Sequence, residues 1–154
     1  MKSRLHLKTS SGQSLVEFAF AFPIFLAVLI GLMAFGILFY SYVTLNLAVR
    51  EGAGVIVHCP SLNCDTPRLN NGNRITSVED VKTFVKEKSF SLATGQINVL
   101  VEPTDRNQWV VGVQVSVSAD YSVPLPTVNI PMLGNGTVRL GTIQIRAQSV
   151  MTIE

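Results

Sequence analysis

An apolar run over residues 15–39, which carries no charge except that of Glu17, is the feature that most constrains how this chain can fold. Its 25 residues are enough for a helix to cross a hydrocarbon core of roughly 30 Å. An ordinary secretory signal has a shorter apolar region, of about 7–15 residues. Lys2, Arg4 and Lys8 precede the run, and the next basic side chain is Arg50. This asymmetry predicts a single membrane-spanning helix with a cytoplasmic N-terminus and an extracytoplasmic C-terminal domain.

Glu17 is costly in such a segment, by roughly 3 kcal/mol on insertion scales, so a carboxylate kept there implies a partner for it. One partner is local, because Ser14 and Glu17 have the S-x-x-E spacing of a capping box. They would stand at the start of one helix over residues 14–57. Pro23 removes one hydrogen bond from that helix and predicts a kink or a local opening around residues 19–22.

Composition separates this helix from an ordinary small domain. Only 14% of the 154 residues are charged, against about a quarter in soluble domains. The residues after the long helix are enough for one modest core. The formal charge is +2, but three of the twelve basic residues precede Gly12, which leaves nine basic against ten acidic side chains. A nucleic-acid partner is therefore not expected.

The rest of the chain predicts a small α+β domain. Ser77, with Asp80 three positions on, predicts the start of an amphipathic helix over 77–93. Strands follow in which apolar residues alternate with polar ones, and the first two strands form a hairpin. Prolines and glycines predict an irregular connection before the last strand. The expected segments are a loop at 59–76, strands at 97–102 and 109–118, a connection at 122–136 and a strand at 141–153.

The outer half of the long helix must project beyond the bilayer and rest on this domain. Ala48 and Gly52 have the small-xxx-small spacing that lets helices approach closely. They could serve contacts between subunits or make room for the chain's own sheet. Arg50 and Glu51 could be a solvated pair at the membrane exit or an intersubunit contact.

Cys59 and Cys64 predict a short-loop disulfide in an oxidising compartment, with two free thiols as the alternative. His58 beside them lacks the further ligands of a metal site, so neither a metal nor another cofactor is expected. The sequence holds no catalytic motif, and we expect no enzyme. Trp109 could cap the sheet core or be exposed to another subunit.

The N-terminal segment resembles the class III signal of type IV pilins and pseudopilins, in the residues GQSLVEFA at 12–19 and the apolar helix after them. In that group a prepilin peptidase cuts after the glycine on the cytoplasmic side. The resemblance makes Gly12 the residue before the cut, Gln13 the new N-terminus and Glu17 the fifth residue of the mature chain. The freed amine of one subunit could then neutralise Glu17 of a neighbour and set the axial register of the bundled helices.

Within that group the segment looks like the TadE-like family of the tight-adherence (Flp) pilus system. That family combines a GQSLVEFA start, a proline in the apolar run and an AAREGAR segment at the helix end. This chain has Pro23 and the residues AVREGA at 48–53, with Val49 for the second alanine and Gly54 for the last arginine. Phe18 in place of tyrosine and the substantial domain favour a minor pilin or pseudopilin over the short major pilin.

The combined expectation is an α+β, pilin-like fold, with a long transmembrane helix packed on a small antiparallel sheet and one short helix. The expected parts are a cleaved basic leader at 1–12, a transmembrane and assembly helix at 13–57 and an extracytoplasmic globular domain at 58–154. Pro23, Ala48 and Gly52 would shape helix packing.

The expected function is assembly of a tight-adherence type IV pilus in adhesion and biofilm formation. The subunit would lie in the bacterial inner membrane, from which it could enter the surface pilus. Its partners would be a prepilin peptidase, other pilin and pseudopilin subunits, the inner-membrane assembly platform and membrane lipid. The competing hypothesis is a membrane-anchored extracytoplasmic domain that binds a ligand or partner and is never processed.

Overall fold

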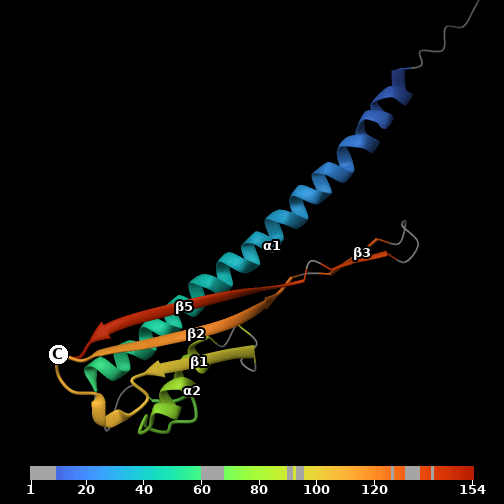
Figure 1. Ribbon diagram of the computed structural model, residues 1–154. Helices are drawn as coiled ribbons and strands as arrows, with labels where there is room; N and C mark the ends of the chain where they lie inside the picture. The colour runs from blue at the N-terminus through green and yellow to red at the C-terminus, as the bar shows by residue number, and fades with distance from the viewer. Residues whose placement is uncertain are drawn as a thin grey trace, which may run out of the picture. The chain divides into compact units, whose positions relative to one another are not determined.

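The computed structural model describes residues 10–59, 68–89, 92, 96–125, 127–130, 136–139 and 141–154. It has the expected α+β elements, a long N-terminal helix, a short second helix and an antiparallel sheet (Figure 1). The chain divides into two compact units, one ending at Ile37 and one beginning at Leu38. The boundary falls inside the long helix, so its last turns belong to the globular unit.

The long helix α1 spans Ser10–His58. It begins earlier than predicted, and its first turn contains no acidic residue. The predicted capping box is therefore wrong, because Ser14 and Glu17 both lie inside the helix. The helix also runs through Pro23 without interruption, so the predicted local opening is not found. One missing hydrogen bond is tolerated where the flanking residues are strongly apolar helix formers.

The short helix α2 spans Val78–Lys88 and confirms the predicted start at Ser77. The Ser77 hydroxyl accepts a hydrogen bond from the Asp80 backbone N–H at 3.1 Å. The Asp80 carboxylate accepts one from the Ser77 N–H at 2.9 Å, which completes a capping box. The helix ends at Lys88, before the predicted residue 93, and the Ser89 hydroxyl donates hydrogen bonds to the carbonyls of Val85 and Lys86.

The main sheet has three antiparallel strands in the order β1-β2-β5. They are β1 (Ile97–Glu102), β2 (Gln114–Pro124) and β5 (Thr142–Thr152). Strand β2 lies in the centre and pairs with β5 over its whole length, from Gln114 opposite Thr152 to Pro124 opposite Thr142. The first strand was predicted with these bounds, and the last strand is close to its predicted range.

The strand predicted at 109–118 is wrong in position, because β2 begins only at Gln114. A short 3-10 helix, Arg106–Gln108, precedes it, and Gly112 has φ +88° in the turn before it. That backbone conformation suits glycine and interrupts the valine alternation. Val111 is 76% exposed, whereas Val115 and Val117 are buried in the strand.

The connection predicted at 122–136 is also more regular than expected. Strand β2 occupies its beginning up to Pro124. Strands β3 (Thr127–Ile130) and β4 (Gly136–Arg139) form a separate two-stranded sheet. Pro124 is compatible with strand structure because it ends β2, where a missing N–H costs least.

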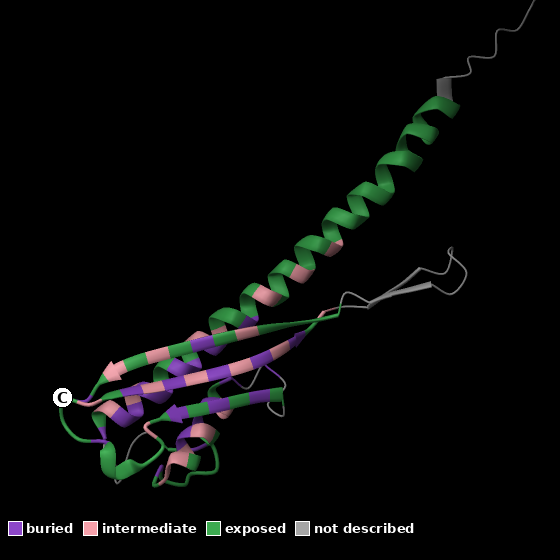
Figure 2. Ribbon diagram, viewed as in Figure 1, coloured by how far each residue is buried: buried purple, intermediate pink, exposed green. Residues whose placement is uncertain are grey.

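The core lies between one face of the main sheet and the two helices of the globular unit. Alternate residues of β1 and β2 are buried (Figure 2). They join Leu45, Val49 and Ile56 of α1 and Val81 and Val85 of α2 in one hydrophobic cluster. The opposite face is mostly polar, with Leu100 and Val150 exposed on it. The outer half of α1 therefore rests on the chain's own sheet, as expected.

Candidate assembly site on the N-terminal helix

Gln13 and Glu17 lie on the same face of α1, one helical turn apart. The Gln13 side-chain amide donates a hydrogen bond to the Glu17 carboxylate at 3.3 Å, and both side chains are exposed. Gly12 is also exposed, and a Cβ placed on it would meet no atom within 4 Å. The three residues singled out by the sequence therefore lie together, within the first turns of an accessible helix.

The helix around this carboxylate presents apolar side chains in every direction. Residues 12–29 are all exposed, among them Leu15, Phe18 and Phe20. Among the described residues, α1 is the one helix that is long and apolar enough to cross a membrane. Such a surface is unstable in water, so α1 fits a single-pass membrane anchor whose apolar side chains face lipid or neighbouring helices.

Ala48 and Gly52 are buried within the globular unit. A Cβ on Gly52 would collide with Cγ2 of Val85 in α2 and lie 3.8 Å from Cγ1 of Val117 in β2. Of the two interpretations of the small-xxx-small spacing, the structure favours the second, because Gly52 makes room for the chain's own helix and sheet. Gly54 differs, since a Cβ there would meet nothing within 4 Å.

Arg50 and Glu51 do not act as a pair. The Glu51 carboxylate forms an ion pair with Lys88 of α2, with 3.1 Å between Oε2 and Nζ. The Lys88 ammonium also lies 5.2 Å from the centre of the Phe84 ring. Arg50 is exposed and forms no ion pair with any residue that the structure describes. Glu51 thus connects α1 to α2, whereas Arg50 has no such partner among the described residues.

The cysteine prediction falls partly outside the described residues. Cys59 directly follows α1, is buried and takes part in a disulfide. The other cysteine, Cys64, lies outside the described residues, so the predicted pairing stays a prediction. Within the described ranges, no three metal-ligating side chains gather at one place.

Trp109 belongs to the core, which resolves the choice that the sequence left open. Its side chain is 4% exposed, and its indole Nε1 donates to the Pro103 carbonyl at 2.9 Å. It lies outside the sheet, after the 3-10 helix, and closes the end of the core.

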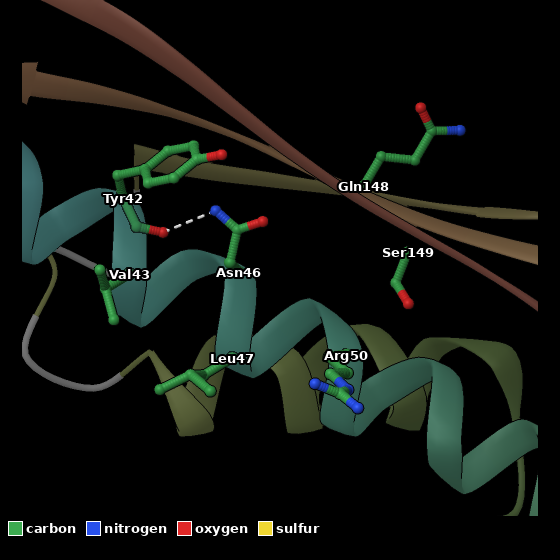
Figure 3. A pocket seen from close by; sticks show the side chains of 7 residues that line it. All are labelled: Tyr42, Val43, Asn46, Leu47, Arg50, Gln148 and Ser149. Atoms are coloured by element: carbon green, nitrogen blue, oxygen red, sulfur yellow. Dashed lines mark hydrogen bonds between the residues drawn. The ribbon is translucent and has the colours of Figure 1, made fainter.

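The sequence did not single out a hollow beside the edge strand β5. Five side chains of α1 and two of β5 line it (Figure 3). On the α1 side, Val43, Leu47 and Arg50 are exposed and share one face of the helix. Local sequence gives no sign of the hollow, because only the tertiary structure brings Gln148 and Ser149 alongside that face.

A comparison with protein families finds one match, over residues 12–54, to the family described as TadE-like protein. The matched range begins at Gly12, includes Glu17 and Pro23, and ends at Gly54 in the outer half of α1. No curated protein and no solved structure matches the chain. The match bears out the resemblance that GQSLVEFA indicated: over residues 12–54 this chain is similar to TadE-like proteins, the family of the tight-adherence pilus system.

Proposed function

We propose that this chain is a minor pilin or pseudopilin of a tight-adherence type IV pilus, with a role in adhesion and biofilm formation. A prepilin peptidase would cut between Gly12 and Gln13 on the cytoplasmic side of the inner membrane. The observation that carries the proposal is the position of Glu17. It lies on an exposed, membrane-length helix that is similar to TadE-like proteins, one turn from the residue that cleavage would make the N-terminus.

The position of Ser14 and Glu17 inside the helix, where they form no capping box, supports this proposal. A carboxylate in the first turn would have a local purpose, because it would satisfy free backbone donors. Glu17 lies beyond the first turn, and among the described residues it accepts one exposed hydrogen bond, from Gln13. The charge therefore keeps most of its membrane cost in the isolated chain.

A neighbouring subunit would offset that cost. The ammonium group of Gln13, freed by cleavage, would form an ion pair with Glu17 of the next subunit, and each charge would neutralise the other in the bilayer. The exposed apolar side chains of α1 would pack against neighbouring helices in place of lipid. The inner-membrane assembly platform would then add the subunit to the fibre through this helix.

The N-terminus of the protein from cells that contain their prepilin peptidase tests the proposal. Mass spectrometry is expected to find Gln13 as the first residue. Gly12→Val should slow cleavage, and Gly31→Val is the matched control, because a Cβ meets no atom within 4 Å at either glycine. An intact N-terminus in the wild-type protein would instead support the unprocessed, membrane-anchored binding domain.

A further inference from the structure

Strand β5 is an edge of the main sheet. The Ile153 N–H donates a hydrogen bond to the Val113 carbonyl, and the Ile153 carbonyl accepts one from the Gly112 N–H. At the other end of the strand, the Gly141 carbonyl accepts a hydrogen bond from the Leu125 N–H. The backbone N–H and C=O groups of successive residues in a strand point to opposite sides, so those of the odd-numbered residues of β5 point at β2. The even-numbered residues, from Thr142 to Thr152, point theirs outward. Among the described residues, no backbone group pairs with that outer side.

This edge lacks the features that usually protect an exposed strand. Natural edges are short, or carry lysine, proline or a bulge that prevents pairing with another chain. Strand β5 spans Thr142–Thr152 with uninterrupted register and contains neither proline nor lysine. Its one charged residue, Arg146, is held by Asp120 of β2 at 3.0 Å on the face away from α1. Among the described residues, nothing on this edge therefore prevents a further strand from pairing with it.

The hollow beside this edge lies where such a strand would place its inward side chains. It measures about 320 Å³ and separates the exposed face of α1 from Gln148 and Ser149 of β5 (Figure 3). A strand added to β5 would lie roughly 4.8 Å from it. It would cover Leu47, which is 56% exposed, and approach the guanidinium of Arg50, which has no ion pair with any described residue.

We propose that β5 accepts an extended segment of a partner protein as a fourth strand, with a carboxylate side chain directed at Arg50 and apolar side chains over Val43 and Leu47. Backbone hydrogen bonds to the even-numbered residues would supply affinity, and the hollow would supply specificity. This goes beyond helix bundling in the membrane and does not depend on cleavage at Gly12.

Charge excludes the simplest self-association through this edge. Strand β5 contains no acidic residue, so the same strand of a second copy brings no carboxylate to Arg50. A second copy would instead add another Arg50 and no carboxylate. The occupant we infer is therefore an acidic strand from a different chain.

A tethered strand tests the proposal in the full chain, purified in detergent micelles. A short glycine–serine linker would be added after Glu154, followed by one further strand. In this strand every second residue is threonine, and the residues between the threonines are valine, glutamate and valine in that order. Hydrogen exchange of the Gln148 and Val150 amides is expected to slow at least about tenfold relative to the unextended chain. A matched strand with lysine in place of glutamate should protect them much less.

Two variants separate the contributions of the backbone and the charge. Val150→Pro removes an outward N–H that the β2 ladder does not use, and it should abolish protection of Gln148 while Trp109 fluorescence remains native. Arg50→Glu should reverse the preference, so that the lysine strand protects and the glutamate strand does not. Arg50 has no ion pair among the described residues, so this change should leave the domain folded.

Three results would overturn the proposal. Unchanged exchange with the glutamate strand would show that the edge does not accept a strand. Equal protection by the glutamate and lysine strands would remove Arg50 from recognition. Protection in the unextended chain that rises with protein concentration would identify a second copy as the occupant. None of these results bears on the mass of the processed N-terminus, so the proposed function is tested separately.

Discussion

At the scale of single residues, Gly52 shows how the long helix is fitted to its own domain. The spacing with Ala48 suits either contacts between subunits or close packing within one. The structure places Val85 where the Gly52 side chain would be. Val85 is fully buried, and a valine in a helix has little rotamer freedom. Gly52 is thus needed for packing within the subunit.

Gly52→Ala is expected to destabilise the globular unit. Overpacking of this kind typically lowers the free energy of unfolding by about 1–3 kcal/mol. Thermal unfolding in micelles, followed by fluorescence of Trp109, the chain's single tryptophan, would measure it. Gly54→Ala is the control, because its Cβ has open space and helix propensity should make it neutral or slightly stabilising. Equal effects of both changes would contradict the packing role.

At the scale of elements, α2 is fixed by its N-terminal hydrogen bonds. Asp80 accepts from the backbone N–H and hydroxyl of Thr76 at 2.9 and 3.0 Å, and from the Ser77 N–H at 2.9 Å. These bonds, the backbone bond from Thr76 first, hold the pKa of Asp80 below its usual value of 3.8 despite partial burial. A carboxylate whose pKa is lowered by folding stabilises the folded state at pH values above its usual pKa.

Asp80→Ala is expected to lower the free energy of unfolding by about 1 kcal/mol at neutral pH, as for loss of a helix cap. The difference between wild type and variant should shrink as the pH falls below 3.8 and through the lower folded-state pKa, because the wild-type carboxyl then becomes protonated. Unfolding followed by Trp109 fluorescence over this pH range measures the difference. A gap that stays constant into acid would show that the carboxylate charge does not contribute.

At the scale of the whole molecule, the chain combines a helix that needs a non-aqueous partner with a domain that satisfies its own core. Two ion pairs join elements within the domain, Lys88 with Glu51 and Arg146 with Asp120. Glu17 in the membrane helix and Arg50 beside β5 lack an oppositely charged partner among the described residues. We propose contacts with other chains at these two charges.

Glu17→Ala and Glu17→Gln are expected to leave cleavage after Gly12 largely intact and to abolish incorporation into pili. The amide of Glu17→Gln can still hydrogen-bond Gln13 but cannot neutralise an ammonium group, so it separates charge from hydrogen bonding. Sheared pili and membranes, compared by mass spectrometry for the processed chain, provide the measurement. Normal incorporation of the glutamine variant would mean that the carboxylate charge has no part in assembly.

The sequence by itself determined the parts that depend on local composition. The membrane-length helix follows from the uninterrupted apolar residues, and the start of α2 follows from Ser77 and Asp80. The position of β2 could not be obtained in this way, because the valine alternation continues through 109–113 and only the turn at Gly112 ends it. The capping interpretation of Glu17 failed because the strongly helical sequence continues upstream to Ser10.

The tertiary structure alone decided which surfaces are used within the subunit and which remain for others. Gly52 faces Val85 and Val117, and Glu51 faces Lys88, across distances in sequence that no local pattern reports. The hollow between α1 and β5 lies beside the side of β5 that no described strand pairs with. Sequence periodicity fixes which side chains share a face. Long-range packing decides what that face meets.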